Sequence, residues 1–292
     1  MWDKRSLSEK IETSYLRRRL VDRLMKLVLA CATILALVPL ISILIYIGYQ
    51  GVHAINWDFF TQTPKPVGEE GGGLANSLVG TLILAGIASL VGIPWGLATG
   101  IYLSEYGEGP WPKLVRFSTD LLSSVPSIII GLFIFEILVS HMGHFSAFAG
   151  GLSLAVIMIP ILARSTEELL RMVPNHVREA GLALGLSRWR VTLLIVLRGS
   201  WNGIASALIL ALARISGETA PLLFTAFNNQ YWSVHLNEPI SSLPVQMYTY
   251  AISPFEEWQK QAWAGALVLV VFVLMINGLT RYLLGSNKGT SR

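Results

Sequence analysis

Residues 178–226 read REAGLALGLSRWRVTLLIVLRGSWNGIASALILALARISGETAPLLFTA, and this stretch decides the fold. Its first part is polar and rich in small residues. Its second part is an apolar run long enough to cross a bilayer, for which about 20 residues are needed. Arg214 and Glu218 nevertheless lie inside this run. Ionisable residues at such depth are costly and usually face a bundle interior or a water-filled path. The stretch therefore indicates a membrane protein with a functional polar site.

The composition of the whole chain agrees with a membrane protein. Of its 292 residues, 53% are hydrophobic and only 14% are charged, and the mean hydropathy is +0.56. Soluble domains carry about 25% charged residues on average. The single cysteine, Cys31, excludes an intrachain disulfide. We therefore predict an all-α, polytopic membrane protein and no nucleic-acid partner, because the basic residues lie in loops between apolar runs.

Six apolar runs are long enough to be membrane spans. We predict them at about 26–49, 74–103, 118–139, 145–163, 200–224 and 262–284. The first run is too long for the core of a signal peptide, and no small-residue cleavage site follows it. The predicted organisation is an N-terminal segment at 1–25, a six-span domain at 26–284 and a tail at 285–292. Pro94 is expected to kink the second span, and Pro126 lies near the start of the third.

The placement of lysine and arginine predicts the orientation. The segment before the first span, the loop between spans four and five, and the tail are basic, whereas the loops predicted outside hold only Lys65 and Lys260. Cytoplasmic loops carry an excess of lysine and arginine. Both termini are therefore predicted to be cytoplasmic.

Two segments predicted outside the membrane are long, at 50–73 and 228–261. Both are rich in aromatic residues, and the second also contains several prolines. Loops of such length in a compact protein are often functional. A partner surface, a lid over a pore and a packed cap remain alternative interpretations.

The charged pair of the fifth run is the first candidate site. Arg214 and Glu218 are four residues apart, which places them on one helix face. We expect Arg214 to meet an anionic substrate while Glu218 holds its guanidinium and limits overly tight capture. A buried ion pair that only fixes helix packing is the alternative. Pro221 lacks a backbone N–H, so carbonyls one turn earlier could be freed towards a cavity.

A second basic candidate, Arg164, ends the fourth span. The planar guanidinium group suits an oxyanion, because it can bind two oxygens at once. From the pattern alone, an arginine that extends to the membrane interface is the favoured interpretation. Glu167 and Glu168 lie beside it and could hold its side chain.

The loop from about 164 to 199 is the third candidate. Pro174 can open a short helix, Gly185 fits a helix C-cap, and Ser187 can cap a following helix. A helix, a glycine turn and a second helix in a cytoplasmic loop form a plausible docking element for a partner groove. An amphipathic loop on the membrane surface is the alternative.

Several kinds of catalytic site are missing from the sequence. There is no G-x-x-x-x-G-K-[ST] phosphate-binding loop and no H-E-x-x-H motif. His141 and His144 lie in a short loop, but two nitrogen ligands do not complete a metal site. We therefore interpret them as surface histidines and expect any nucleotide hydrolysis to occur on another subunit.

Several motifs together resemble one known family. The segment REAGLALG followed by RWRVTLLIVL resembles the cytoplasmic EAA signature of ABC-importer permeases. The segments ARISGETAPLLFTAFNNQYW, SSLPVQMY and SPFEEWQKQAWAGALVL closely resemble the PstA-type permeases of bacterial phosphate importers. The likeness runs from about Leu74 to Leu284. The EAA signature alone indicates only an importer permease, and the later segments make the phosphate assignment specific.

The resemblance implies a six-span permease fold with a cytoplasmic coupling-helix loop, in the bacterial cytoplasmic membrane. It implies a heterodimer with a PstC-like permease, two ATPase subunits that use ATP and Mg²⁺, and a periplasmic phosphate-binding protein. This chain itself is then no enzyme and binds no cofactor. By position, Arg214, Glu218 and Arg164 correspond to the family's substrate pathway. The residues that match the ATPase-docking signature are Glu179, Ala180, Gly181 and Gly185.

The sequence departs from the family pattern at two places. Gly181 replaces the second alanine of the signature, a small-for-small change that is expected to permit close docking. The proline usual at the end of the signature is replaced around 197–198, which leaves the start of the fifth span uncertain. The rival functions are a permease for another oxyanion, such as sulfate or molybdate, and an autonomous ion-coupled carrier.

Overall fold

The computed structural model describes residues 4–67, 69 and 71–285. The regular elements in this part of the chain are all helices, which confirms the predicted all-α class. The chain divides into two compact units, 1–50 and 51–292. The first unit consists of most of helix α1 (Lys4–Ala54), which contains Pro39. The first predicted span, 26–49, lies within α1, but the helix begins well before it.

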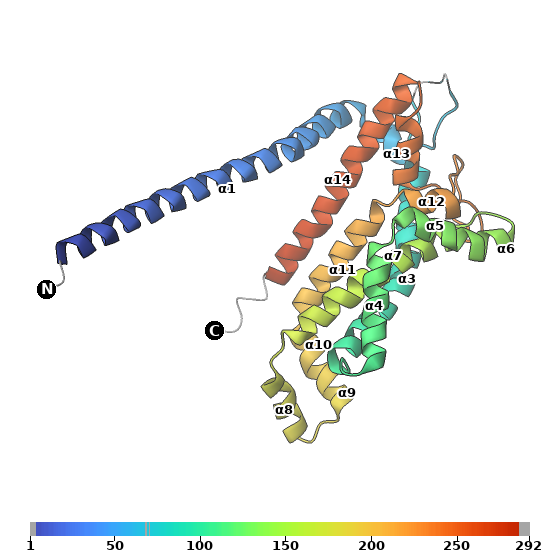
Figure 1. Ribbon diagram of the computed structural model, residues 1–292. Coiled ribbons are helices and arrows are strands. Elements are labelled where there is room, and N and C mark those ends of the chain that lie inside the picture. Colours follow the sequence, from blue (N-terminus) through green and yellow to red (C-terminus); the bar gives the residue numbers. More distant parts are fainter. Residues whose placement is uncertain (1–3, 68, 70, 286–292) are drawn as a thin grey trace. The chain divides into compact units, whose positions relative to one another are not determined.

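The second unit contains the remaining helices. Their bounds are α2 (Trp57–Thr61), α3 (Ala75–Glu105), α4 (Pro110–Ser124), α5 (Ser127–Ile134), η1 (Phe135–Val139), α6 (Ser140–Met142), α7 (Ala147–Arg171), α8 (Asn175–Ala183), α9 (Arg188–Val191), η2 (Thr192–Val196), α10 (Leu197–Gly199), α11 (Trp201–Ser216), α12 (Ala220–Thr225), α13 (Leu243–Ala251) and α14 (Glu256–Gly285). In Figure 1, α3, α7, α11 and α14 run alongside one another. The short helices α8 and α9 lie at one end of this bundle, and α5, α12 and α13 lie at the other.

Four of the described helices are long and apolar enough to cross a membrane, and two bent helix pairs raise the number to six if each pair is one span. The third predicted span is one of these pairs, since the chain turns by 103° between α4 and α5. Pro126 explains this bend. A residue before proline is driven out of the helical region, and Val125 is extended, with φ −69° and ψ 129°. The fourth predicted span continues as α7 to Arg171, eight residues beyond the predicted end at 163.

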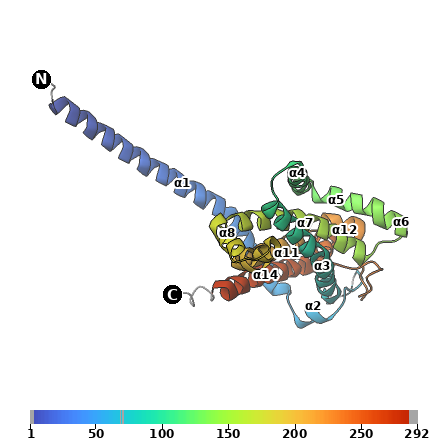
Figure 2. The ribbon, with the colours of Figure 1, turned by 90° about the horizontal axis from the view of Figure 1, so that it is seen from below.

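The close pairing of α3 with α7 forms the centre of the second unit. Gly92, Gly96 and Gly100 recur at every fourth position of α3 and are buried. A Cβ atom at Gly96 would lie 2.6 Å from the Cβ of Leu162, and one at Gly100 would lie 2.5 Å from the Cβ of Thr166. Small residues at this spacing let helix backbones approach closely. The two helices therefore form one rigid pair, which Figure 2 shows between α4 and α14.

The long segment predicted at 228–261 folds against the start of α3. It contains α13, and a buried hydrogen bond of 2.7 Å joins the hydroxyls of Ser77 and Ser241. The backbone N–H of Leu243 donates to Thr81 Oγ1 at 2.8 Å. Gly80 lies so close to the Ser241 carbonyl that no larger side chain fits there. This part of the segment is therefore packed onto the bundle, as the cap interpretation predicts.

Candidate functional site

The fifth predicted span, 200–224, is interrupted at its charged pair. Helix α11 ends at Ser216, residues 217–219 are not helical, and α12 begins at Ala220. Pro221 lies in the first turn of α12, where its missing N–H is tolerated, although proline cannot continue a preceding helix. The sequence predicted that Pro221 frees backbone carbonyls about one turn earlier, and the break between α11 and α12 lies there.

Arg214 and Glu218 meet across this break. The distance from Arg214 Nη1 to Glu218 Oε1 is 2.6 Å, and the side chains are 61% and 8% exposed. Glu218 Oε1 accepts no well-aligned hydrogen bond in the described part of the chain, so the contact is mainly electrostatic. Among the described residues, no other ion pair or hydrogen bond holds the Arg214 guanidinium. Its remaining N–H groups are therefore free for a ligand.

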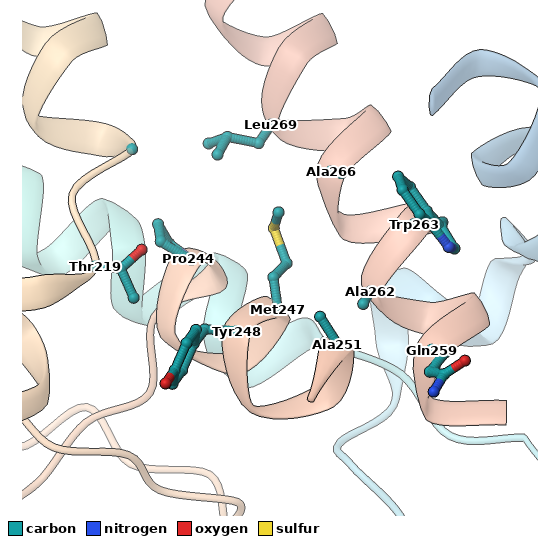
Figure 3. Close-up of a pocket in the computed structure, with 11 residues that line it drawn as sticks. Thr219, Pro244, Met247, Tyr248, Ala251, Gln259, Ala262, Trp263, Ala266 and Leu269 are labelled. Carbon is teal, nitrogen blue, oxygen red and sulfur yellow. The ribbon is translucent and has the colours of Figure 1, made fainter. Parts of the chain in front are cut away.

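A cleft of about 480 Å³ adjoins the break. Figure 3 shows it between α13 and α14, with Thr219 at one side and Met247 extending between the two helices. None of its eleven lining residues is charged, and Thr219, Tyr248 and Gln259 are the polar ones. An anion has no counter-charge in this cleft. The positive charge that favours an oxyanion therefore lies at the Arg214 guanidinium and not among the residues that line the cleft.

The other basic candidate is held by acidic side chains. Arg164 Nε donates to Glu168 Oε1 at 2.9 Å. Its Nη1 lies 3.8 Å from Asp120 Oδ1 and 4.0 Å from Glu167 Oε2. Its side chain is 47% exposed. The expected tie to Glu168 is therefore present, and the surrounding carboxylates offset the positive charge that an anion would meet.

Glu167 is the centre of an ion-pair cluster that the sequence analysis did not anticipate. Its side chain is 2% exposed. Its Oε1 accepts from Arg116 Nε at 2.9 Å and from Arg116 Nη2 at 2.7 Å, and it lies 2.9 Å from Arg171 Nη2. The i,i+4 spacing signals the contact with Arg171, but no local pattern connects Glu167 to Arg116 on α4.

The docking element has the predicted order of helix, glycine turn and helix, but Ser187 precedes α9 without forming the expected side-chain cap hydrogen bond. Helix α8 ends at Ala183, and Gly185 adopts φ +82°. The N–H of Gly185 donates to the Leu182 carbonyl at 2.9 Å, and that of Leu186 donates to the Gly181 carbonyl at 3.3 Å. A glycine in the left-handed region commonly closes a helix in this way. The predicted glycine C-cap is confirmed.

The four docking candidates do not share one environment. Glu179, Ala180 and Gly185 are exposed, whereas Gly181 is buried. A Cβ atom at Gly181 would lie 2.9 Å from side-chain atoms of both Val191 and Ile195. The small residue at 181 thus permits close packing within this chain, and its surface is not available to a partner.

The two loop histidines show no sign of a metal site. His141 Nδ1 lies 3.1 Å from the Glu136 carbonyl oxygen, and His144 Nδ1 lies 3.2 Å from that of Phe145. In the described part of the chain, no group of three or more His, Cys, Asp or Glu residues could hold a metal ion.

The relatives found by comparison with known proteins agree with one another. Residues 92–286 match the family described as "Binding-protein-dependent transport system inner membrane component". The chain is 48% identical to "Phosphate transport system permease protein PstA" of Haemophilus influenzae, over 86% of this chain and 89% of that protein. It is 47% identical to the Xylella fastidiosa (strain Temecula1) protein of the same name, over 94% of this chain and 96% of the relative.

The fold likewise resembles that of a solved transporter. A chain of the MetNI methionine ABC transporter in an inward-facing conformation superposes with a TM-score of 0.58. The match covers 73% of this chain and 94% of that chain at 18% sequence identity. At this identity the likeness supports the fold, a polytopic helical permease, and carries no argument about substrate.

Proposed function

This chain belongs to the family of binding-protein-dependent transport system inner membrane components, and we propose that it is the PstA-type permease subunit of an ATP-driven importer of inorganic phosphate. The observation that carries the proposal is the Arg214–Glu218 pair, a half-open ion pair at a break in an apolar helix. The extensive similarity to permeases named PstA supports phosphate as the substrate.

The geometry of the pair suits a transported oxyanion. The Arg214 guanidinium can present two N–H groups to two phosphate oxygens, and such charge-assisted pairs are strong and directional. Glu218 lies within 2.6 Å of the same guanidinium. Its negative charge repels the anion and lowers the affinity of the site, so a bound phosphate can leave. Transport needs such moderate affinity, because a tightly held substrate would not be released.

The exposure of Arg214 supports a shared pathway. A side chain that is 61% exposed in the isolated chain cannot remain against lipid at low cost. In our proposal this face meets a second, PstC-like permease, and the two subunits enclose the phosphate route. Arg164 lies further along this route, where Glu168 and Glu167 orient its side chain.

In the proposed assembly, two copies of an ATPase dock at α8, through the exposed Glu179, Ala180 and Gly185. These subunits bind ATP and Mg²⁺, and a periplasmic binding protein delivers phosphate. The complex lies in the bacterial cytoplasmic membrane with both termini of this chain in the cytoplasm. The docked ATPases shift the balance between two arrangements of the helices, and this shift produces alternating access.

Radiolabelled phosphate uptake tests this function. Cells that lack the chain are compared with the same cells carrying it on a plasmid, with excess unlabelled sulfate as competitor. We expect the plasmid to restore uptake that sulfate does not inhibit. If uptake is not restored although the chain is in the membrane and binds an ATPase, phosphate is rejected as the substrate. The permease architecture would still be supported. Inhibition by sulfate or molybdate would indicate a different oxyanion importer.

A further inference from the structure

The direct polar attachment of α8 to the long helices depends on one arginine. Helix α8 has nine residues, and an isolated helix of that length is marginal in water. Its position must therefore be set by tertiary contacts. Gly181 packs against Val191 and Ile195, which belong to the segment immediately after α8. That contact fixes the shape of the docking element, and Val191 and Ile195 also pack in an apolar cluster that includes Leu170 of α7. The direct polar connection of α8 to the long helices is made by another residue.

Arg178 makes that connection. Its Nη2 donates to Glu105 Oε1 at 3.0 Å, and its Nε lies 3.3 Å from the same oxygen. Its Nη1 donates to the Val173 carbonyl at 2.5 Å, and its Nη2 also donates to the Leu170 carbonyl at 2.8 Å. Glu105 is the last residue of α3 and Leu170 belongs to the last turn of α7. One guanidinium group thus joins the ends of both long helices to α8.

The ion pair is shielded from solvent, and no other side chain of α8 duplicates it. The Arg178 and Glu105 side chains are only 18% and 14% exposed, so water screens their attraction less than that of a surface pair. Within the described residues, no other α8 side chain forms a hydrogen bond or ion pair with α3 or α7. Thr192 Oγ1, 3.3 Å from Glu105 Oε2, further orients the carboxylate.

Movement at α8 would reach the proposed substrate site through this connection. Helices α3 and α7 form one rigid pair along their glycine contacts, and α11, which carries Arg214, packs against α7 through the core that includes Ile157, Leu208 and Ile215. Figure 1 shows α8 at the end of the second unit opposite to α12. Coupling between distant sites requires such a continuous chain of contacts with two arrangements.

We propose that the Arg178–Glu105 ion pair is the joint that makes α3 and α7 follow α8 when a docked ATPase moves it. Both residues are positioning residues, because neither contacts the substrate. The inference rests on the proposed function, since it assumes a motor that acts on α8. Without the joint, only the apolar contacts of the docking element transmit the movement of α8, and ATP hydrolysis drives transport less efficiently.

The test measures phosphate taken up per ATP hydrolysed, in proteoliposomes that contain the complete transporter. Arg178→Gln and Glu105→Gln are each expected to lower this ratio by about tenfold, within the usual range of coupling between sites. The double variant should be no worse than the single ones, because both changes remove the same interaction. Arg178→Lys keeps the positive charge, so its complex should take up more phosphate per ATP hydrolysed than the Arg178→Gln complex.

Arg171→Gln is the matched control. It removes an arginine at the same end of the molecule that pairs with Glu167 at 2.9 Å and donates to the Leu103 carbonyl of α3 at 3.5 Å. Among the described residues it forms no hydrogen bond or ion pair with α8. The Arg171→Gln complex should take up about as much phosphate per ATP hydrolysed as the unmodified complex. Co-purification of the ATPase is measured for every variant, so that lost assembly is distinguished from lost coupling. Normal ratios in assembled Arg178→Gln and Glu105→Gln complexes would overturn the proposal.

A second readout separates this proposal from the proposed function. We also expect the loaded external binding protein to stimulate ATP hydrolysis through the same joint, because a continuous set of packed contacts transmits a change from either end. If the unmodified complex takes up no phosphate, the phosphate assignment fails. Loss of stimulation in the Arg178→Gln complex would still support the joint, and unchanged stimulation would reject it. Because Glu105→Gln keeps the carbonyl contacts of Arg178, it remains informative if Arg178→Gln assembles poorly.

Discussion

Replacement of Arg214 by glutamine separates a transport role from a packing role. Arg214→Gln removes the cation that we place on phosphate and keeps a polar side chain of similar reach. We expect phosphate uptake to be abolished while the permease still assembles with its partners. Arg214→Lys keeps the charge but loses the planar fork, so it should retain weak uptake.

The structure also gives the cost of this change to stability. Glu218 is 8% exposed and would lose the partner that lies at 2.6 Å. Removal of one partner from a fully buried pair costs about 3–5 kcal/mol. Because the Arg214 side chain is 61% exposed, solvent already screens the pair, and we expect a loss of about 1–3 kcal/mol. The double variant Arg214→Gln/Glu218→Gln should recover most of this stability, since no uncompensated carboxylate remains.

The assay combines radiolabelled phosphate uptake with thermal unfolding of the purified complex. The expected pattern is low stability and no uptake for Arg214→Gln, and recovered stability with still no uptake for Arg214→Gln/Glu218→Gln. Recovery of uptake together with stability would show that the pair only fixes helix packing. Full uptake by well-expressed Arg214→Gln would refute the assignment directly.

Three further predictions concern packing, the docking turn and the ion-pair cluster. Gly100→Leu overpacks the α3–α7 contact and should destabilise the purified complex by about 1–3 kcal/mol, whereas Gly86→Ala, with no atom within 4 Å of the added Cβ, should be neutral or slightly stabilising. Gly185→Ala forces a side chain into φ +82° at a cost of about 1–2 kcal/mol, and the ATPase that co-purifies should decrease severalfold. Glu167→Gln removes the buried carboxylate and should cost about 1–3 kcal/mol in thermal unfolding, while the exposed Glu168→Gln should cost little.

Much of the fold follows from local patterns. The second and sixth predicted spans correspond to α3 and the larger part of α14, because a long apolar run has few alternatives to a helix in a membrane. The glycine turn at 185 was also predictable, since a left-handed residue after a short helix favours glycine. The bounds of the other spans were less accurate, because helices such as α7 extend past the apolar run into polar sequence.

The candidate site was predicted in part. The i,i+4 spacing predicted the contact of Arg214 with Glu218, but the expected shared helix face is wrong, because α11 ends at Ser216 and Glu218 lies beyond it. Pro221 pointed to this local disturbance of the helix. The sequence left Arg164 open between a pathway residue and a tied arginine, and the structure shows it surrounded by carboxylates. The inward position of Gly181 was not anticipated, because a small residue in a docking signature looks the same whether it faces a partner or its own chain.

The sequence by itself therefore determined the class of protein, the apolar helices, the docking turn and the charged pair, because hydrocarbon thickness, helix periodicity and glycine conformation act over a few residues. Only the tertiary structure decided which distant groups meet. The contact of Arg178 with Glu105 joins residues 73 apart in the chain, and that of Arg116 with Glu167 joins residues 51 apart. Such pairs depend on how α3, α4 and α7 pack, and no local pattern specifies that packing.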